Sequence, residues 1–522
     1  PLSATNILKR SEADEDRFTN SIKGNFVLVF IDSNKRYCRL FNGHSGMLPF
    51  YYALDGTRFI FSTSLSAAGN YLLNPPELDQ VAIAEMVIFN HPLKDRTYYQ
   101  QVKMLQPAEI VCTSIHGLSH KRWWDARSLL DAPLYSKNEA LELGSDLFAR
   151  TVNSYAVDIK RVRVSFTSGF DSRAILAVLN KDPSEILADS FGTPGSLNVS
   201  IPIEICEQQR IPFYPIYLEQ EYEKVFDEYA LRALWLSDGL STVERANYPY
   251  AFEKLADFSP VVLTGLFGSE LMRTFQNVGH VVNANLVRLN TAQDACQELR
   301  MLWKTPETWR YFRADFFSQN LEEVIADLKE AWLDRFGDLS PDQRLYMFLL
   351  SEGLRKYFGA EIQMERPWGT NRFPFLDDDF VEFAFRAPFA GVHSQTLTPT
   401  IENRFQSQYF YAYVIRKYRP KLLAALTDHG YAPRDVLGPL PLLRLSPQYM
   451  YWRWRRKRTH YQEFKTEEWT EKLYQRLLFS QAKEPEFFSP LLRQDFENGA
   501  WKLHRLDFAR AASFKLWLEM QD

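Results

Sequence analysis

The sequence predicts an α/β protein with an antiparallel β-rich N-terminal domain, a parallel sheet flanked by helices, and a helical C-terminal part. Three observations predict this arrangement. Short β-rich runs divided by turn residues fill 25–62, helix and strand patterns alternate over 138–264, and amphipathic, aromatic-rich helical patterns follow Asn283. Alternation of helices and strands is typical of a parallel sheet with helices on both faces.

The N-terminal domain is expected over residues 1–130. An antiparallel meander is predicted with strands at 25–32, 36–41, 49–54 and 58–62. Asp55 and Gly56 form one of its turns. A helix at 79–89 and a β-run at 109–113 complete the domain, and a polar linker near 131–137 marks its boundary.

The second domain is expected over residues 136–430. Helices are predicted at 138–155, 171–180 and 202–209, with strands at 161–166, 186–191 and 213–218. A further helix and a strand ending at 260–264 extend the sheet. Residues 431–522 are expected to form a helical extension packed on this domain.

Composition excludes several classes of protein. A chain of 522 residues exceeds one core, so two or three domains are expected. A net charge of -4 gives no bias toward nucleic acid, and none is expected as a partner. Because no apolar run approaches about 20 residues and the N-terminus lacks a signal-peptide pattern, we expect a cytoplasmic protein without a transmembrane segment. The four scattered cysteines are interpreted as buried thiols in a reducing compartment.

One loop carries the chemistry predicted for the parallel sheet. The segment 167–172, TSGFDS, runs from a predicted strand into a predicted helix, where backbone N–H groups meet phosphates. Gly169 allows close backbone approach, and Asp171 can hold magnesium. Hydroxyl donors come from Thr167, Ser168 and Ser172. The alternative interpretation is a helix N-cap without a ligand.

The loop resembles the SGGxDS phosphate loop of the asparagine synthetase-like family, the N-type ATP pyrophosphatases that include asparagine synthetases, β-lactam synthetases and lasso-peptide cyclases. Other segments resemble family motifs in the same order: 24–32 (GxFAxxxxD), 43–52 (DxxGxxPLYY), 59–64 (FASE), 263–271 (SGxGxDEL) and 372–377 (RxPFLD). The resemblance implies a divergent member, with an N-terminal glutaminase-like domain of the Ntn type and a PP-loop ATP pyrophosphatase domain.

The resemblance also implies an activity, an ATP-dependent, AMP-forming amide-bond ligase. ATP would activate a substrate carboxylate as an acyl-adenylate, and an amine would attack it, in biosynthesis of a specialised peptide or polysaccharide product. ATP and Mg²⁺ are the implied cofactors, and a precursor peptide or a sugar acid is the implied kind of substrate. The implied site residues are Asp171 and Glu270 for magnesium and catalysis, Thr167, Ser168, Gly169 and Ser172 for phosphates, Phe166 and Gly192 beside adenosine, and Thr264 and Gly265 on the opposite wall.

The N-terminal domain departs from the family pattern at its nucleophile. The family's glutaminase uses an N-terminal cysteine, whereas Pro1 begins this chain and its first cysteine is Cys38. Glutamine hydrolysis is therefore not expected of the chain as given. Relatives that join a substrate's own amine show such a loss, and a shortened N-terminus explains it equally well.

The synthetase domain departs from the pattern at two places. Ser269 and Leu266 stand where the family has acidic residues, and a hydroxyl is a weaker ligand than a carboxylate for a hard cation. The family's lysine after PFLD has no clear counterpart. Arg416 and Lys417 either replace it as catalytic, phosphate-pairing cations or cover a helix C-terminus. A noncatalytic scaffold or binding protein that retains the fold is therefore the alternative function.

An aromatic and basic segment at 449–458 has two interpretations. It forms either a packed helix whose basic side chains extend to solvent, or a surface for an anionic membrane, a lipid-linked glycan or a peptide. The histidines show no HExxH or comparable pair, so a catalytic metal centre of that kind is not expected.

Overall fold

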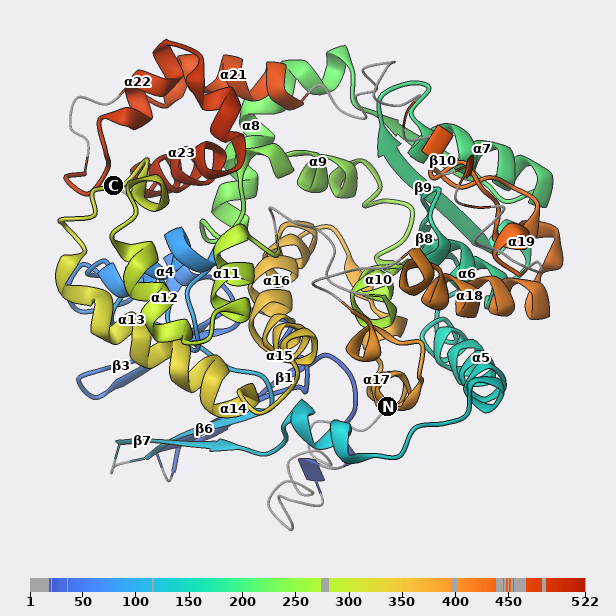
Figure 1. Ribbon diagram of the computed structural model, residues 1–522, viewed down its shortest axis with the longest axis horizontal. Helices are drawn as coiled ribbons and strands as arrows, with labels where there is room; N and C mark the ends of the chain where they lie inside the picture. The colour runs from blue at the N-terminus through green and yellow to red at the C-terminus, as the bar shows by residue number, and fades with distance from the viewer. Residues whose placement is uncertain are drawn as a thin grey trace.

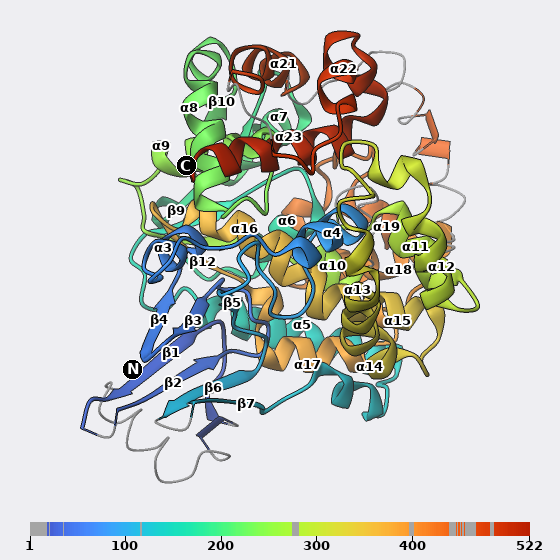
Figure 2. The same ribbon diagram turned by 90° about the vertical axis from the view of Figure 1, so that its left-hand side faces the viewer.

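The computed structural model describes residues 18–19, 21–34, 36–114, 117–273, 281–395, 401–437, 445, 447–448, 450–451, 454, 466–480 and 485–521. Its strands form a four-stranded sheet in the order β1-β2-β6-β7, a three-stranded sheet β4-β3-β5, and a five-stranded sheet β10-β9-β8-β11-β12. Figures 1 and 2 show the two N-terminal sheets (blue) together at one end of the molecule, apart from the five-stranded sheet.

The N-terminal strands belong to two facing sheets, so the predicted single meander is wrong. One sheet joins β1 (Val27–Asp32), β2 (Tyr37–Asn42), β6 (Glu109–Ser114) and β7 (Gly117–Arg122), all antiparallel. The other joins β3 (Tyr51–Asp55) with β4 (Arg58–Ser62) and β5 (Lys103–Met104). Burial explains the split, since Leu40 and Val111 from the first sheet pack with Tyr52 from the second in one apolar cluster.

Two helices lie between β4 and β5 in the chain. α3 (Leu65–Asn70) begins at the cap Ser64, whose side chain accepts from the Ala67 N–H. α4 (Gln80–Phe89) matches the predicted helix and begins at the cap Asp79. The turn η1 (Ala126–Asp131) then leads into α5 (Lys137–Ser154), which opens on a capping box.

The five-stranded sheet is parallel throughout, as predicted. Its strands are β8 (Val162–Ser165), β9 (Ile186–Gly192), β10 (Phe213–Tyr217), β11 (Val261–Thr264) and β12 (Thr370–Arg372). α6 (Phe170–Val178) follows β8 as expected. α7 (Leu197–Gln209) begins five residues before the predicted start at 202, because Pro202 lies inside the helix rather than at its first position.

Helices dominate after β10. Beyond Asn283 the sequence indicates this, although β12 is a strand that its pattern did not reveal. They are α8 (Gln220–Leu236), α9 (Asn247–Lys254), α10 (Gly268–Met272), α11 (Ala284–Thr291), α12 (Ala295–Trp303), α13 (Leu321–Leu328), α14 (Asp334–Phe336), α15 (Pro341–Phe348), α16 (Leu354–Glu365), α17 (Asp378–Arg386), α18 (Ile401–Tyr418), α19 (Pro433–Val436), α21 (Thr466–Leu477), α22 (Leu491–Glu497) and α23 (Arg505–Glu519). One apolar cluster joins Ile83 of α4, Val164 of β8 and Trp517 of α23, so the N-terminal helices share a core with the rest of the chain.

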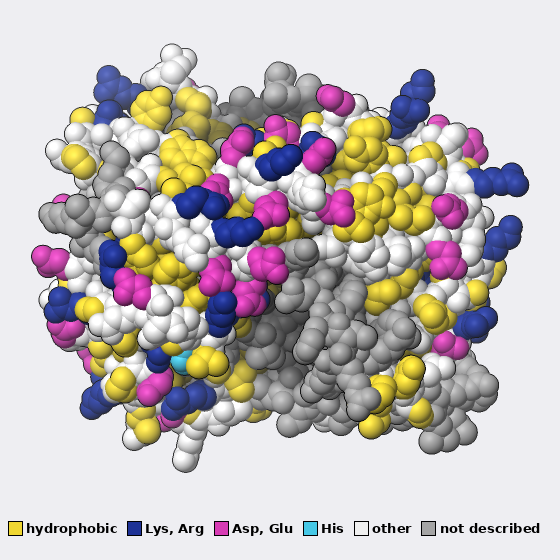
Figure 3. All heavy atoms as spheres, turned by 90° about the horizontal axis from the view of Figure 1, so that it is seen from above, with side chains coloured by type: hydrophobic (Ala, Val, Ile, Leu, Met, Phe, Trp, Pro, Cys, Tyr) yellow, Lys and Arg dark blue, Asp and Glu magenta, His cyan; other side chains and the backbone are white. Residues whose placement is uncertain are grey.

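The helices and the surface can be compared with what the composition led us to expect. Within the described part of the chain, every helix is too short or too polar to span a bilayer. On the face seen in Figure 3, basic and acidic side chains are interspersed rather than gathered by sign.

The cysteines differ in burial. Cys38 and Cys206 are buried as predicted, but Cys112 and Cys296 are partly exposed, so the interpretation of all four as buried thiols is wrong. Cys112 lies on the face of β6 that carries Ile110 and packs only in part against that apolar cluster.

Candidate functional site

A cleft of about 530 Å³ opens where β8, β9 and β11 end. This is the edge at which an open parallel sheet binds its ligands. The predicted site residues that line it are Thr167, Gly169, Asp171, Ser172, Thr264, Gly265 and Glu270. Two segments about a hundred positions apart in the sequence, around the start of α6 and around the start of α10, therefore line one cavity side by side.

The loop before α6 is closed by its own hydroxyl groups. The Thr167 N–H donates to Ser172 Oγ at 3.1 Å, and the Gly169 N–H donates to Thr167 Oγ1 at 3.4 Å. Gly169 is the N-cap of α6, and no side chain caps this helix, contrary to the expectation of a Ser, Thr or Asp cap. Whether the loop binds a ligand stays a prediction. The first N–H groups of the helix consequently remain suited to an anion.

Glycines bring the two walls together. A Cβ on Gly265 would lie 2.9 Å from the Ser172 nitrogen, and a Cβ on Gly268 would lie 2.9 Å from Asp171 Cγ. Either contact is closer than real Cβ atoms tolerate. Side chains at these two positions would therefore push the α10 segment away from the start of α6.

Asp171 is held by the segment that faces it. Ser269 Oγ donates to Asp171 Oδ2 at 2.7 Å, and Arg273 donates in turn to Ser269 Oγ. The other carboxylate oxygen, Oδ1, is buried and has no hydrogen-bond partner among the described residues. One oxygen of Asp171 is thus engaged, while the other is still able to accept a ligand.

Glu270 lies in the same cleft. Burial raises its pKa to about 7, and the nearby charge of Asp171 adds to this shift. Magnesium is commonly bound through one or two carboxylates together with substrate phosphates rather than by a protein cage. Asp171 and Glu270 fit that mode. Among the described residues, no three His, Cys, Asp or Glu side chains are grouped so as to hold a metal ion.

Charged residues that the motifs did not indicate line the cleft as well. Glu361 and Glu365 stand one turn apart on α16, and burial raises the pKa of both, that of Glu365 to about 8. Arg245 lies 3.3 Å from Glu361 and donates to the hydroxyl of Tyr357. The i, i+4 spacing of the two glutamates could have been recognised in the sequence. The contact of Arg245 with Glu361 could not, because the two residues are more than a hundred positions apart.

A buried ion pair supports the strands under the cleft. Arg163 on β8 makes two hydrogen bonds to Asp189 on β9, at 2.6 and 3.0 Å, and both side chains are almost fully buried. The guanidinium also stacks on Phe252, 4.5 Å from the ring centroid. This bidentate pair joins adjacent strands and lines the cleft, although neither residue was predicted as part of it.

Three predicted residues lie behind the cleft instead of on its lining. Phe166 is fully buried in the core. Ser168 is buried, and its hydroxyl donates to Asn198 Oδ1 at 2.7 Å. Gly192 ends β9 without reaching the lining, where its neighbour Phe191 lies.

Arg416 and Lys417 are not brought to the cleft. They lie exposed near the end of α18, and the ammonium of Lys417 contacts Glu142 and Asp146 of α5 at 2.9 and 2.8 Å. Arg416 stacks on the ring of Tyr413. In the described structure, these contacts agree with the interpretation that Arg416 and Lys417 cover a helix C-terminus. The cationic residues that line the cleft are Arg163, Arg245 and Arg505.

The aromatic and basic segment at 449–458 lies largely outside the described residues. Met450, Tyr451 and Trp454, which are described, are at least half exposed. Its two interpretations both stay open.

Comparison with known proteins agrees with the motifs. Residues 5–124 match the model of a glutamine amidotransferase domain. Over 289 residues, 53% of this chain, the sequence is 21% identical to a Methanocaldococcus jannaschii protein named as an asparagine synthetase (glutamine-hydrolyzing), of which 54% is covered. The chain thus spans about half the length of this curated relative. Both similarities agree with the resemblance of the motifs to asparagine synthetases, and the first indicates an amidotransferase-like N-terminal part.

Proposed function

We propose that this protein is an ATP-dependent, AMP-forming amide-bond ligase that adenylates a carboxylate and joins it to an amine in the cytoplasm. The supporting observation is the meeting of the phosphate loop, Asp171 and Glu270 in one cleft at the ends of parallel strands. The similarity to an asparagine synthetase agrees with ATP as the co-substrate.

The phosphate loop would hold the triphosphate of ATP. Backbone N–H groups at the start of α6 and the hydroxyls of Thr167 and Ser172 are the donors, and Gly169 allows the backbone to approach. Arg245, which lines the cleft, is the cation that we propose for pairing with phosphate in place of Arg416 and Lys417.

Asp171 and Glu270 would hold magnesium beside the phosphates. When bound, the ion would neutralise charge on the departing pyrophosphate. The protein's own contribution is then electrostatic and positional, since its donors are fixed before the reaction. Deprotonation of Glu270 near neutral pH would complete the carboxylate pair.

The amine is proposed to belong to a substrate. Cys38 lies buried in β2, and burial raises its pKa to about 11, which makes its thiolate scarce at neutral pH. Cys112, the other cysteine of the matched segment, receives a hydrogen bond from the Tyr37 hydroxyl. Neither is arranged as a nucleophile for glutamine hydrolysis. A precursor peptide or a sugar acid is the proposed kind of substrate.

Exchange of labelled pyrophosphate into ATP tests the adenylation step. The full chain with Mg²⁺ should catalyse exchange with a member of a panel of peptide and sugar-acid carboxylates, and Asp171→Asn should abolish it. Asp146→Asn, which changes an aspartate outside the cleft, serves as the control. Absence of exchange with every carboxylate, together with absence of ATP binding, would rule the proposal out.

A noncatalytic scaffold is the second candidate, and the contacts of Asp171 favour it. Ser269 occupies one carboxylate oxygen, and Arg273 places a positive charge close to where a metal would lie. A scaffold would keep its cellular role with Asp171→Asn, whereas a ligase would lose it. Complementation of a deletion strain by the two forms therefore separates the candidates.

A further inference from the structure

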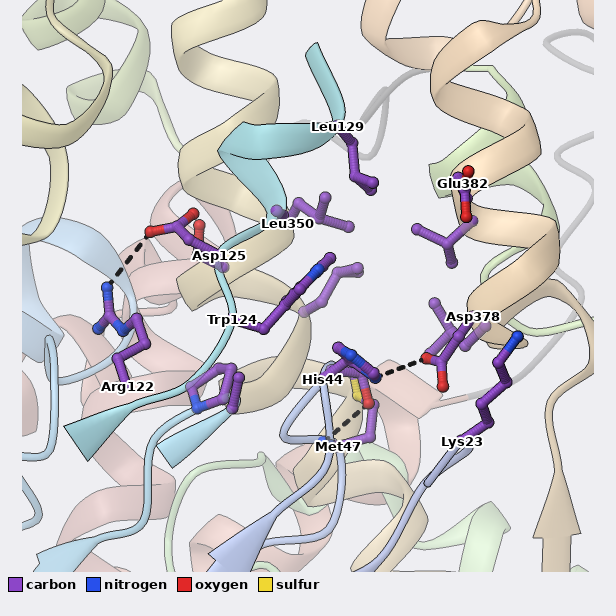
Figure 4. Close-up of a pocket in the computed structure, with 18 of the residues that line it drawn as sticks. Lys23, His44, Met47, Arg122, Trp124, Asp125, Leu129, Leu350, Asp378 and Glu382 are labelled. Atoms are coloured by element: carbon purple, nitrogen blue, oxygen red, sulfur yellow. Dashed lines mark hydrogen bonds and ion pairs between the residues drawn. The ribbon is translucent and has the colours of Figure 1, made fainter. Parts of the chain in front are cut away.

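A second cavity, of about 330 Å³, lies between the N-terminal sheets and the helices of the parallel-sheet part (Figure 4). Its walls come from the loop at His44, the linker at Trp124 and helix α17. The volume is at the lower end of that of small-molecule pockets, about 300–1,000 Å³. The described residues that line it are all different from those of the ATP cleft.

Much of the lining of this cavity is apolar. The apolar residues that line it include Met47, Pro107, Trp124, Leu129, Leu350, Leu354, Leu376 and Val381. Figure 4 shows the Trp124 ring lying across the centre, with Leu350 and Leu129 above it. A half-buried indole in such a wall gives a flat surface for an apolar ligand body.

One end of the cavity carries excess positive charge. Arg122 and Arg335 share a single carboxylate oxygen, Asp125 Oδ2, at 3.6 and 2.9 Å. The Arg335 Nε is buried and has no acceptor among the described residues. Nearby Glu352 pairs with Arg355 at 2.9 Å and offsets the charge of Arg335 only in part, because it is shared between the two guanidinium groups. Two guanidinium groups with one carboxylate suit an anionic ligand group.

The opposite end carries excess negative charge. Asp378, Asp379 and Glu382 project from α17, and Lys23 pairs with Asp379. Asp378 accepts from the Gly24 N–H at 2.8 Å and lies 3.1 Å from His44 Nδ1. Glu382 forms no ion pair with any described residue. In Figure 4, Asp378, Glu382 and Lys23 stand on one side of Trp124, and Arg122 and Asp125 stand on the other.

We propose that this cavity binds a small zwitterion whose ammonium and carboxylate lie at opposite ends of an apolar body, namely a short apolar peptide. Its ammonium faces Asp378 and Glu382, its carboxylate faces Arg122 and Arg335, and its side chains lie against Trp124. A free amino acid carries both charges on one carbon, so its two charged groups lie closer together than those of a peptide. The site does not depend on the proposed ligase reaction.

Calorimetric titration of the full chain with leucyl-leucine and its blocked forms tests the site. Leucyl-leucine should bind, and leucine, the N-acetyl peptide and the peptide amide should each bind more weakly. Glu382→Gln should weaken binding of leucyl-leucine about fivefold and leave the N-acetyl peptide unaffected, because that peptide has no ammonium to lose. Arg122→Gln should weaken leucyl-leucine similarly and leave the amide unaffected.

Exposed residues outside the cavity provide matched controls. Glu468→Gln and Arg150→Gln make the same changes of charge there and should leave the affinity unchanged. The proposal is overturned if leucyl-leucine does not bind, if leucine or either blocked peptide binds as tightly, or if the two cavity variants bind all the peptides like the wild type. The series of peptides on the wild-type chain decides the matter even if a variant fails to fold.

Discussion

At the residue scale, Glu365 makes the cleft sensitive to pH. Burial, reinforced by the charge of Glu361, raises its pKa from 4.5 to about 8, so the folded state binds more protons than the unfolded state between those values. Stability should therefore fall as pH rises through this window. Glu365→Gln removes that dependence and should stabilise the protein at pH 8 by about 2–4 kcal/mol, with little effect near pH 4.5.

Thermal melts of both proteins from pH 4.5 to 9 measure this effect. The melting temperature of the wild type should fall below that of the variant as pH rises. Glu468→Gln, on an exposed part of α21, is the control and should follow the wild type throughout. Parallel curves for the wild type and Glu365→Gln would show that Glu365 titrates normally.

Two glycines of the cleft should respond differently to a methyl group. A Cβ on Gly169 would meet only Thr167 Oγ1, at 3.5 Å, whereas one on Gly265 would lie 2.9 Å from the Ser172 nitrogen. Gly169→Ala should keep its stability and lose ATP affinity, because the methyl group obstructs the approach of phosphate to the backbone. Gly265→Ala should lose both, with stability reduced by about 1–3 kcal/mol.

Urea denaturation and equilibrium binding of an ATP analogue separate these outcomes. Each variant is the control of the other, since both add one methyl group at the edge of the same cavity. Equal stability of the two variants would contradict the role given to Gly265 in packing the two loops together.

At the element scale, the prediction from sequence is best where contacts are local. The segment 167–172 was found because one short motif contains the loop, the helix start and Asp171. Arg245 and Glu365 were not predicted as site residues, because they reach the cleft only when α8, α9 and α16 pack around the sheet. Of the N-terminal strands, β1, β2, β3, β4 and β6 were located, whereas β5 and β7 were not. The division into two sheets depends on long-range burial that alternation does not reveal.

The Arg163–Asp189 pair shows what holds β8 beside β9. Removing one partner of a buried ion pair leaves an unpaired charge and typically costs about 3–5 kcal/mol, whereas replacing both can cost much less. Arg163→Met should therefore destabilise the protein strongly. The double variant Arg163→Met with Asp189→Leu should be more stable than Arg163→Met alone.

A double-mutant cycle from urea unfolding measures the coupling between these two residues. Arg232→Met, which breaks a partly exposed pair with Glu253, is the control and should have a much smaller effect. Additive losses from Arg163→Met and Asp189→Leu would mean that the pair does not act as a unit.

At the scale of the whole molecule, the N-terminal part and the helices behave as one body because buried polar contacts cross between them. Asp238, fully buried after α8, accepts from the Leu65 N–H of α3 at 2.9 Å and from Gln363 of α16 at 2.8 Å. Lys94 and Arg96, which follow α4, both contact Asp327 of α13. Charges paired across so extensive a shared core favour a single cooperative unfolding transition.

Asp327 is the residue on which this coupling should depend most. Although burial opposes it, hydrogen bonding to Arg96 and the charges of Arg96 and Lys94 hold its pKa below the usual 3.8. Its contribution to stability is therefore present above that value and is lost as pH falls through the folded-state pKa. At neutral pH, Asp327→Asn should cost about 1–3 kcal/mol, because Lys94 and Arg96 lose a shared, buried carboxylate but keep Glu330 and Asp79 as partners. In scanning calorimetry the wild type should give one transition and the Asp327→Asn variant a lower melting temperature, with the difference shrinking toward pH 3.

Asp338→Asn is the control. It alters a mostly exposed partner of Arg127 and should melt like the wild type. Two resolved transitions in the wild type, or equal melting of the two variants, would show that the N-terminal part unfolds independently of the helices.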